Sequence, residues 1–349
     1  MSASGRKVAI IGAGICGISS AICLQKADPS LDITLISEKF SPNLTSNGAA
    51  GFWDPVFLKN TPVTKIRKWG ETTFKYLKSI VDSNDAHKYQ MKYLTVYELH
   101  DQPAEKSELS DIFISYEQLS NKEIRRNFPS DIVTGFVMRS IIIPGTPYLN
   151  IKMSEFQQKG GKIIQRKVKS FDEFAGEYDI VINCAGLGAR ELCNDDTIQP
   201  FRGQVVKMKA PWIKNGYILT RKKNKEKFLT TYIFPRAYDV IVGGTLQPNN
   251  WDTTINDKET EAIIERASEL EPTIKNEAVI IEAWAGLRPV RDSVRLEHEI
   301  INVSTKYGSK MKLQVVHNYG HGGGGLSLFW GCAVDVRDLV LSSLMQSNL

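Results

Sequence analysis

A glycine pattern near the N-terminus constrains the fold of this chain more than any other feature. The segment VAIIGAGICG starts as a β-branched run, and Gly12, Gly14 and Gly17 follow in the spacing GxGxxG. The next residues, ICGISSAICLQKA, carry apolar side chains at helical spacing, and LDITLISEK at 31–39 is typical of a strand. This order of strand, glycine turn, helix and strand predicts a βαβ unit that binds an adenine dinucleotide, with the pyrophosphate at the helix N-terminus.

An acidic residue at the end of the second predicted strand supports this interpretation. Glu38 follows Gly17 by about twenty residues, where dinucleotide-binding units place the carboxylate that accepts hydrogen bonds from the ribose. The motif alone does not distinguish FAD from NAD, because both contain the same ADP half. An NAD-dependent dehydrogenase is therefore one alternative at this point.

A second glycine-rich segment lies near the other end of the chain. LQVVHNYGHGGGGLSLFWG runs from strand-like residues through glycines into an apolar helix, and YDIVINCAGLGARELC at 178–193 has the same order. Three such elements place their turns at the carboxyl edge of one parallel sheet. An NAD domain does not need this late return to the sheet, so we predict FAD, with the last glycine run and its helix N-terminus against the flavin ring.

The segments between these elements have a different character. Strand-like and helical stretches alternate with proline- and aromatic-rich loops such as IIPGTPY and YIFPRAY. We therefore expect an α/β fold in which a Rossmann-like FAD-binding domain is interleaved with a mostly antiparallel-sheet substrate domain. The predicted FAD-binding domain comprises residues 1–55, 151–195 and 300–349, and the predicted substrate-binding domain comprises residues 56–150 and 196–299.

Composition argues against several other classes of protein. No apolar run is long enough to span a membrane, and the N-terminus lacks the apolar core of a secretory signal, so we expect folding in a reducing compartment. The net charge of +5 is modest, and the basic run RKKNKEK at 221–227 lacks interleaved aromatic residues, which argues against nucleic acid as a partner. The five cysteines form no CxxC pair, so we expect buried thiols and neither disulfides nor a metal site.

Seven segments, in order along the whole chain, resemble the FAD-dependent D-amino-acid oxidase family, which includes D-aspartate oxidases. They are IGAGICG, AAGFWDP, DIVINCAG, RGQVVKMKAPW, TYIFP, GLRPVRD and HNYGHGGGGLSLFWG. The resemblance implies transfer of a hydride from the α-carbon of a D-amino acid to flavin N5, with O2 as the electron acceptor. The products are a 2-oxo acid, ammonia and H2O2. Such a transfer requires orientation of the substrate, so no acid or base residue is predicted.

The resemblance also assigns cofactor contacts along the chain. The implied contacts are Gly12, Ala13, Gly14, Ile15 and Gly17 at the pyrophosphate, Glu38 and Lys39 at the adenosine end, Thr45 and Ser46 at the phosphates, Gly51 and Val168 at further parts of the cofactor, and Gly323, Gly324, Gly325, Leu326 and Ser327 along the flavin ring.

Three residues are implied to hold the D-amino acid itself. Arg288 in GLRPVRD matches the arginine that binds the substrate carboxylate, and a guanidinium provides a bidentate geometry that lysine lacks. Tyr232 matches the tyrosine that donates a hydrogen bond to the same carboxylate. The carbonyl of Gly324 is expected to receive the substrate amine. His317 and His321 flank the glycines, and we interpret them as packing or hydrogen-bonding residues.

Two positions depart from the family pattern. Phe228 replaces a second active-site tyrosine four residues before Tyr232, so the segment 219–231, which resembles a mobile lid, closes the pocket without that hydroxyl. Leu246 stands where D-aspartate oxidases place a basic residue, which favours the branch of broader specificity. D-aspartate oxidase remains the alternative within the family.

Two charged residues bear on the substrate side chain. Asp54 favours a cationic side chain, Arg221 favours an acidic one, and a pair between the two would leave the pocket close to neutral. We predict a preference for neutral to basic D-amino acids. A non-enzymatic flavin-binding protein is the alternative from another class, and the retention of Arg288 and Tyr232 argues against it.

The last three residues, Ser347, Asn348 and Leu349, resemble the S-K-L peroxisomal address with its basic middle position replaced. Together with a predicted H2O2-producing reaction, they favour the peroxisomal matrix and an import receptor as a partner. The cytoplasm is the alternative location. The sequence is compatible with a homo-oligomer.

Overall fold

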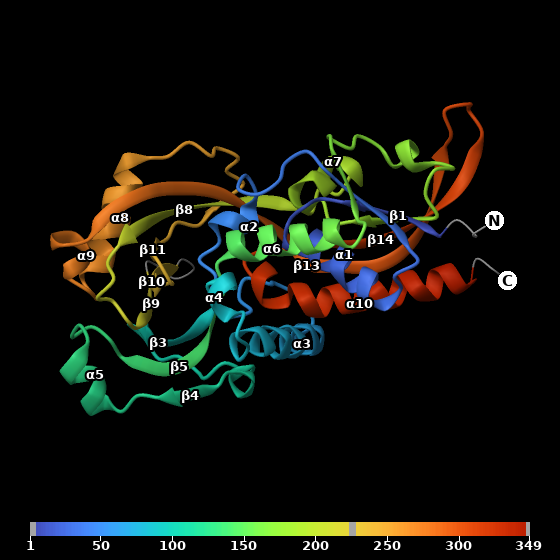
Figure 1. Ribbon diagram of the computed structural model, residues 1–349. Coiled ribbons are helices and arrows are strands. Elements are labelled where there is room, and N and C mark those ends of the chain that lie inside the picture. The colour runs from blue at the N-terminus through green and yellow to red at the C-terminus, as the bar shows by residue number, and fades with distance from the viewer. Residues whose placement is uncertain (1–4, 223–227, 347–349) are drawn as a thin grey trace.

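One twisted sheet runs the length of the molecule and connects its two halves (Figure 1). The structure is a computed structural model that describes residues 5–222 and 228–346. The strand order is β4-β5-β3-β9-β10-β11-β8-β13-β14-β7-β1-β2-β6, with β12 paired to β8. The strands are β1 (Lys7–Ile11), β2 (Asp32–Ser37), β3 (Lys92–His100), β4 (Ser115–Gln118), β5 (Thr134–Ile142), β6 (Lys162–Gln165), β7 (Ile180–Asn183), β8 (Gln199–Lys209), β9 (Gly216–Lys222), β10 (Phe228–Pro235), β11 (Val240–Gly243), β12 (Gln247–Pro248), β13 (Val279–Ser304) and β14 (Lys310–His321).

The helices gather on the faces and at the ends of this sheet (Figure 1). The α-helices are α1 (Ile15–Ala27), α2 (Thr45–Gly48), α3 (Val63–Val81), α4 (Ala86–Tyr89), α5 (Asn121–Asn127), α6 (Gly145–Gln158), α7 (Ala189–Leu192), α8 (Asp257–Ser268), α9 (Thr273–Asn276) and α10 (Gly325–Gln346). Three short 3-10 helices are η1 (Ser110–Ile112), η2 (Phe171–Phe174) and η3 (Gly186–Gly188).

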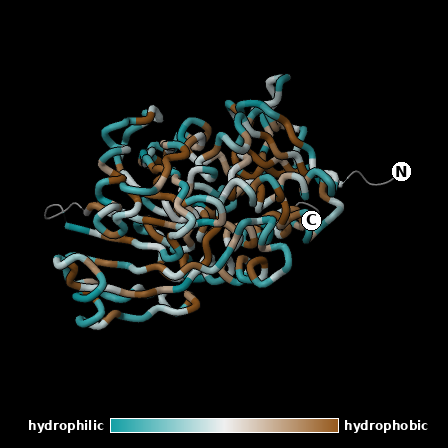
Figure 2. Tube along the Cα trace, turned by 60° about the vertical axis from the view of Figure 1, so that its left-hand side comes forward, coloured by the Kyte–Doolittle hydropathy of each residue, from teal (hydrophilic) through white to brown (hydrophobic). Residues whose placement is uncertain are grey.

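The parallel half of the sheet is formed by β14, β7, β1, β2 and β6. Its inner strands β1, β2 and β7 are almost entirely buried, as expected for strands that are covered on both faces, whereas the edge strand β6 is largely exposed. Val8 and Ile10 of β1 belong to the core on the face of α1, α6 and α10, whereas Ala9 and Ile11 pack on the other face, toward η2 and the far ends of β13 and β14. Figure 2 shows hydrophobic segments in the interior and hydrophilic ones at many surface turns. The predicted Rossmann-like half is confirmed.

The other half of the sheet is mostly antiparallel, as predicted. β9, β10, β11, β8 and β13 pair antiparallel in that order, and β3, β5 and β4 form a second antiparallel group. The parallel pairing of β3 with β9 joins these groups. The α/β fold class expected from the sequence is therefore confirmed.

The two halves share structural elements. β13 pairs with β8 from Val279 to Val290, and from Arg295 onward it continues as the partner of β14. Helix α3 comes from a segment that we assigned to the substrate domain, yet it packs against α10. A Cβ at Gly331 would lie 2.3 Å from the carbonyl oxygen of Trp69, so this close helix crossing requires glycine. The residue ranges of the FAD-binding and substrate-binding domains therefore remain a prediction.

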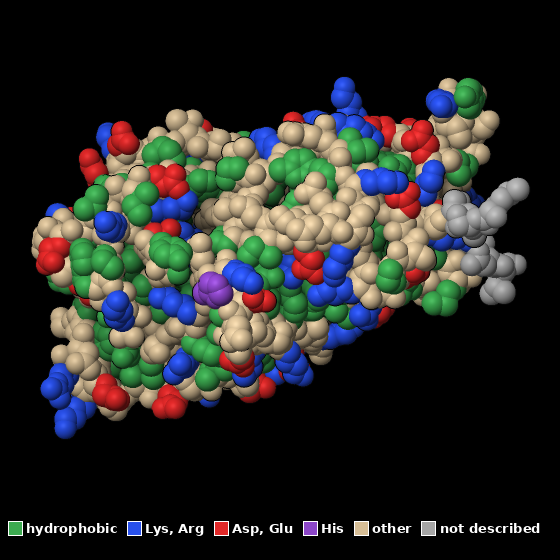
Figure 3. Space-filling view, in the orientation of Figure 1, with side chains coloured by type: hydrophobic (Ala, Val, Ile, Leu, Met, Phe, Trp, Pro, Cys, Tyr) green, Lys and Arg blue, Asp and Glu red, His purple; other side chains and the backbone are tan. Residues whose placement is uncertain are grey.

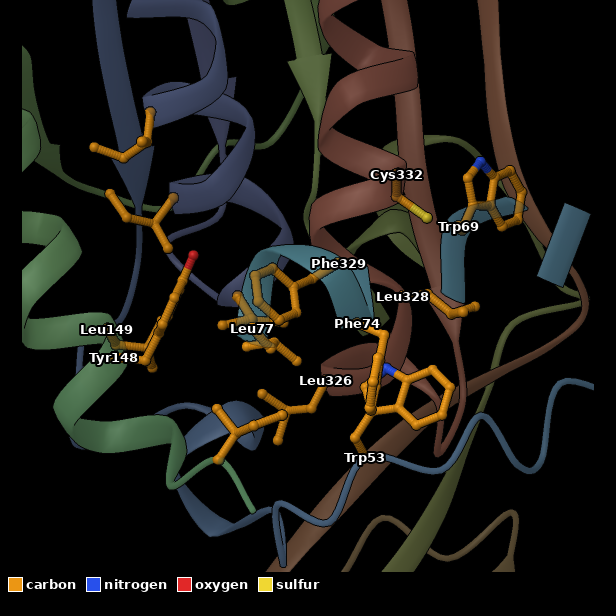
Figure 4. Packing of buried hydrophobic residues seen from close by; sticks show 14 of the residues in the cluster. Trp53, Trp69, Phe74, Leu77, Tyr148, Leu149, Leu326, Leu328, Phe329 and Cys332 are labelled. Atoms are coloured by element: carbon orange, nitrogen blue, oxygen red, sulfur yellow. The ribbon is translucent and has the colours of Figure 1, made fainter. Parts of the chain in front are cut away.

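An aromatic core lies beneath the start of α10 (Figure 4). Trp53 and Phe74 meet edge to face, with ring centroids 4.7 Å apart, and Phe329 packs edge to face on Tyr148 from α6. The indole Nε1 of Trp53 donates a hydrogen bond to the carbonyl of Ser327, at 3.0 Å. Burial of such rings contributes several kcal/mol each. This packing fixes the position of the α10 N-terminus.

The structure also bears on the classes that composition argued against. Among the described residues, no helix is long and apolar enough to cross a membrane, and no group of His, Cys, Asp or Glu side chains is arranged to hold a metal ion. All five cysteines are free: three are buried, whereas Cys16 and Cys193 are only partly so. Basic and acidic side chains are interspersed on the face shown in Figure 3.

Candidate active site

One elongated cavity of about 1440 Å³ runs along the carboxyl ends of the parallel strands and across the antiparallel half of the sheet. Glu38 and Val168 line one end of it. Tyr232 and Arg288 line the other end, and the first and last glycine turns lie between them. The cavity therefore joins the two glycine-rich segments that lie far apart in the sequence.

The first glycine turn leads directly into α1. Gly12 has φ of +100°, which side chains rarely adopt. Gly17 does not line the cavity, so its predicted contact with the pyrophosphate is not supported; a Cβ there would lie 1.8 Å from the Gly12 carbonyl oxygen, and this glycine allows α1 to pack closely on the turn. Gly14 faces the cavity, where an added Cβ would have only Ser46 Oγ within 4 Å. The first N–H groups of a helix have no intrahelical acceptor, so this turn is suited to a pyrophosphate.

The adenosine end predicted around Glu38 lies at the carboxyl end of β2. Glu38 follows Ser37, lines the cavity, and forms no ion pair with any described residue. Lys39 and Val168 line the same region. The structure adds Arg166 and Lys167, which the sequence analysis did not assign; both line the cavity and come from the segment that follows β6. This end therefore combines one free carboxylate with three basic side chains.

Four further predicted cofactor contacts line the middle of the cavity. Thr45, Ser46 and Gly51 come from the segment between β2 and α3, and Ile15 begins α1. The Ile15 N–H donates to Ser46 Oγ at 3.2 Å. Thr45 Oγ1 donates to the carbonyl of Leu287 at 3.1 Å, which links this segment to β13. Ala13, Gly12 and Gly14 also line the cavity.

The last glycine run differs from its prediction at one position. Gly323, Gly325, Leu326 and Ser327 line the cavity as expected. Gly324 does not: its carbonyl accepts the N–H groups of Ser327, at 2.9 Å, and Leu328, at 3.1 Å, and a Cβ there would lie 2.9 Å from Leu58. The assignment of Gly324 to the flavin ring and to the substrate amine is therefore wrong, because that carbonyl belongs to the first turn of α10.

The residues present fit a dinucleotide with a flavin ring. Gly14 leaves room for the backbone to approach a pyrophosphate, Glu38 offers acceptor oxygens to a ribose, and the N-terminus of α10 opens onto the middle of the cavity. Along the cavity, Glu38, the Gly14 turn and the α10 N-terminus follow one another as the ribose, the pyrophosphate and the flavin ring do in FAD.

Glycines create the space for Arg288 and Tyr232, the two residues that are predicted to bind the substrate carboxylate. A Cβ at Gly203 would lie 2.1 Å from Nη1 of Arg288. A Cβ at Gly243 or Gly244 would lie 2.5 Å or 2.8 Å from the hydroxyl of Tyr232. Arg288 and Tyr232 therefore extend over glycine positions, where no side chain of the neighbouring backbone occupies the space.

The charge of Arg288 has no counterion in the described protein. Its Nη1 donates to the carbonyl of Thr245 at 3.3 Å, and no described carboxylate lies within 4.0 Å of the guanidinium. Burial raises the pKa of the Tyr232 hydroxyl above its usual value, although the charge of Arg288 acts in the opposite direction. Tyr232 is therefore a protonated donor beside a partly buried cation, an arrangement that suits an anionic ligand.

Known proteins confirm the family. The family model for FAD-dependent oxidoreductases matches residues 7–339. The chain belongs to this family. It is 39% identical to a D-amino acid oxidase of Dugesia ryukyuensis, over 98% of this chain and 99% of that protein, and 32% identical to the D-aspartate oxidase of Homo sapiens, over 96% and 94%. The crystal structure of glycine oxidase from Geobacillus kaustophilus has the same fold, with a TM-score of 0.72, 15% identity and coverage of 97% and 95%.

Membership of the FAD-dependent oxidoreductases decides between the two dinucleotides. The cofactor is FAD, as predicted from the second glycine run, and the NAD-dependent dehydrogenase is not supported. Of the two histidines that flank the last glycine run, only His321 lines the cavity, whereas His317 contacts Glu299 and Asn183 behind it. Both are buried, and burial lowers the pKa of each to about 4, which agrees with a packing or hydrogen-bonding role. Both imidazoles are therefore neutral at pH 7.

Two acidic side chains lie at the substrate end of this FAD-dependent enzyme. Asp54 follows Trp53, its N–H donates to Ser327 Oγ at 3.1 Å, and burial together with the charge of Glu98 raises its pKa to about 7. Glu98 also lines the cavity, and the sequence analysis missed it. One signal was available: period-two alternation places Glu98 on the same face of β3 as the buried Leu94 and Val96.

The structure does not bring Arg221 to the cavity. Its Nε donates to Asp131 at 2.8 Å, its Nη1 pairs with Glu269, and it is absent from the cavity wall. The expectations that it attracts an acidic substrate or pairs with Asp54 are therefore wrong, because it is held by other acids on the surface. Leu246 does line the cavity.

The predicted lid is only partly described. Residues 223–227 and the side chain of Phe228 lie outside the described part of the structure, so their predicted roles stay predictions. On either side, Thr220, Leu229 and Thr230 line the cavity, and the hydroxyls of the two threonines lie 3.3 Å apart.

Proposed function

We propose that the protein is a D-amino-acid oxidase that converts D-amino acids with neutral to basic side chains, together with O2, into 2-oxo acids, ammonia and H2O2. The observation that carries this proposal is the unpaired guanidinium of Arg288 beside the Tyr232 hydroxyl, in the cavity that also contains the FAD-binding turns. Relatives named D-amino acid oxidase and D-aspartate oxidase, which match nearly the whole chain, support it.

The protein's contribution to this reaction is the orientation of the substrate. Arg288 binds the α-carboxylate through two N–H groups, and Tyr232 donates to the same carboxylate. When bound, FAD supplies the hydride acceptor and passes the electrons to O2. Because the carbonyl of Gly324 is already used, we assign the substrate amine to the carbonyl of Gly323, which lines the cavity and accepts no hydrogen bond from a described residue.

The distribution of charge argues against D-aspartate as the preferred substrate. Among the described basic residues that line the cavity, Arg288 alone lies at the substrate end, since Lys39, Arg166 and Lys167 surround Glu38 at the other end. A second substrate carboxylate would meet Leu246 and the two acids Asp54 and Glu98. D-aspartate oxidase remains the alternative, supported by the human relative.

Anaerobic reduction of the FAD-loaded protein tests the proposal directly. The protein is mixed in turn with D-Ala, D-Arg, D-Asp and L-Ala, and the flavin absorbance near 450 nm, a wavelength general to oxidised flavins, is followed. We expect rapid bleaching by D-Ala and D-Arg only. Bleaching by D-Asp alone would assign the protein to the D-aspartate oxidases. A yellow protein that no D-amino acid bleaches would instead be a non-enzymatic flavin-binding protein.

We further propose that the protein acts in the peroxisomal matrix and that the import receptor is a partner. The proposal is based on Ser347, Asn348 and Leu349, which lie outside the described residues, and on the H2O2 that the proposed reaction releases. A fluorescent protein fused before this tripeptide should co-localise with catalase. Diffuse cytoplasmic fluorescence of the full-length fusion would support the cytoplasm instead.

A homo-oligomer is also proposed, without an assigned interface. The exposed apolar side chains of Val279, Ile280 and Ile281 are compatible with contact between copies. Light scattering coupled to size-exclusion chromatography gives the mass in solution, and a mass of one chain at micromolar concentration would contradict the proposal.

A further inference from the structure

The sheet places the acidic side chain of Glu98 in register with Tyr232, one of the two residues proposed to bind the substrate carboxylate. Glu98 on β3 is opposite Ile218 on β9, and Ile218 is opposite Tyr232 on β10. Side chains at opposed positions of neighbouring strands project from the same face of a sheet. All three residues line the cavity. Because strands are about 4.8 Å apart, Glu98 lies roughly 10 Å from Tyr232 along this row.

Arg288 lies on the opposite side of Tyr232 from Glu98. The strand order between them is β3-β9-β10-β11-β8-β13, with Glu98 on the first strand and Arg288 on the last. A D-amino acid whose carboxylate is bound by Arg288 and Tyr232 can therefore extend its side chain over Ile218 toward Glu98. Ile218 is a suitable surface for the methylene groups of a long side chain.

Glu98 retains acceptor capacity at the cavity. The His100 Nε2–H donates to its Oε1 at 3.2 Å, and the Tyr116 hydroxyl donates to its Oε2 at 2.5 Å. Although burial opposes ionisation, these two hydrogen bonds lower the pKa of Glu98 below its usual value. A carboxylate offers about four acceptor sites, so each oxygen of Glu98 can accept another hydrogen bond.

Asp54 provides a second carboxylate near the same place. Its backbone is fixed by Ser327, but no described side chain donates a hydrogen bond to its carboxylate, which lines the cavity. No described Lys or Arg forms an ion pair with Asp54 or Glu98. Among the described side chains, Glu98 is hydrogen-bonded only to His100 and Tyr116, and two acids without a Lys or Arg partner do not stabilise the fold; such an arrangement is typical of a binding site.

We infer that Glu98 and Asp54 form a cation subsite that selects D-amino acids with a long, positively charged side chain, of the arginine or lysine type. This inference rests on the proposed D-amino-acid oxidation, and it assigns Glu98 a role in substrate specificity. The bound guanidinium or ammonium group supplies the positive charge that no described Lys or Arg provides to Glu98 or Asp54. A short side chain such as that of D-Ala leaves both acids without a partner.

Comparison of D-Arg with D-citrulline tests the inference, because D-citrulline replaces the charged guanidinium with a neutral urea group of similar shape. We expect kcat/KM of the native enzyme to be about ten- to a hundredfold higher for D-Arg, from charge-assisted hydrogen bonds to the subsite. Glu98→Gln and Asp54→Asn should each reduce this D-Arg to D-citrulline ratio by about tenfold. Equal values for the two substrates in the native enzyme would overturn the inference.

A binding measurement separates recognition from turnover. 5-Guanidinopentanoate has the carboxylate and guanidinium of arginine but lacks the α-amine, so it cannot be oxidised by the proposed reaction. Calorimetry should show tighter binding of this compound than of hexanoate, and the Glu98→Gln substitution should remove most of that difference. Equal affinities of the native protein for the two compounds would contradict the cation subsite.

The matched control is Glu117→Gln. Glu117 is exposed on β4, so this change removes the same charge without reaching the cavity, and the D-Arg to D-citrulline ratio should stay at the native value. An equal fall of the ratio in this variant would mean that net charge, and not the subsite, sets the preference. If no D-amino acid is oxidised at all, the proposed function fails. Oxidation of D-Arg and D-citrulline at equal rates refutes only the subsite.

Discussion

The two ends of the cavity are built in different ways. At the dinucleotide end, the turn from Gly12 to Gly17 presents backbone groups, and glycine is required at positions 12 and 17 because a Cβ there would overlap backbone atoms. At the substrate end, the proposed contacts are the side chains of Arg288, Tyr232 and Glu98, which line the cavity and come from three separate strands. We therefore expect substitutions at the dinucleotide end to affect cofactor binding and stability together, and substitutions at the substrate end to change substrate recognition alone.

The largest expected effect is that of Gly17→Ala. The added Cβ would lie 1.8 Å from the Gly12 carbonyl oxygen, so α1 must move away from the turn. We expect a loss of about 3 kcal/mol or more in the free energy of unfolding, together with loss of bound FAD. Thermal unfolding and the ratio of flavin to protein absorbance measure the two effects.

A second helical glycine serves as the control for this substitution. At Gly70 in α3, the nearest atoms to an added Cβ are side-chain carbons 3.6 Å and 3.8 Å away. Gly70→Ala should therefore keep FAD and gain about 0.5–1 kcal/mol from helix propensity. Equal stability of the two variants would show that the close approach at Gly17 is not needed.

Arg288→Ala should separate substrate recognition from cofactor binding. Loss of a partly buried, bidentate charge contact is expected to cost about 3–5 kcal/mol in kcat/KM, which is roughly a hundredfold to several thousandfold. FAD content and thermal stability should remain native, because the guanidinium has no ion-pair partner in the described protein. Arg221→Ala is the matched control, since Arg221 pairs with Asp131 and Glu269 away from the cavity. Similar kinetic losses in both variants would contradict the assignment.

Gly203→Ala displaces the Arg288 guanidinium without removing its charge. The new Cβ would lie 2.1 Å from Nη1 of Arg288, at the flexible end of that side chain, so the guanidinium must shift while the strand remains in place. Because misplacement of a binding group by about 1 Å can lower rates by about a hundredfold, we expect a fall of about ten- to a hundredfold in kcat/KM for D-Ala with FAD retained. Native kinetics in this variant would mean that the observed position of Arg288 is not the productive one.

The same contrast explains which parts of the molecule could be predicted. The turn at Gly12, Gly14 and Gly17 lies within one short segment, and local geometry alone dictates its residues, so the sequence revealed it. The error at Gly324 has a local cause too: the use of its carbonyl depends on the residue at which α10 begins, and helix ends are uncertain by one or two residues in sequence patterns.

Long-range pairing explains the remaining differences. Glu98 enters the site only because β3 pairs with β9 and β9 with β10, and no local pattern encodes that order. Arg221 was misassigned for the same reason, since its partners Asp131 and Glu269 are distant in sequence. A binding site formed by side chains from several strands is therefore harder to predict from sequence than one formed by the backbone of a single turn.

The smallest expected effect is a pH dependence of substrate preference at the substrate end. Burial and Glu98 raise the pKa of Asp54 to about 7, so Asp54 is neutral below that pH and negatively charged above it. The ratio of kcat/KM for D-Arg to that for D-Ala should therefore rise with pH, by up to about tenfold between pH 6 and pH 8. Both substrates carry an α-amine, and this ratio largely cancels its titration. Glu98, which His100 and Tyr116 contact, is the charged group that acts on Asp54.

Asp54→Asn is the variant that isolates this effect. Without an ionisable group at position 54, the D-Arg to D-Ala ratio should become nearly independent of pH across the same range, because Glu98 stays ionised throughout. FAD content should be unchanged, since the Asp54 carboxylate accepts no hydrogen bond from the described protein. A ratio that keeps its full pH dependence in this variant would assign the titration to another group and leave Glu98 as the sole acid of the cation subsite.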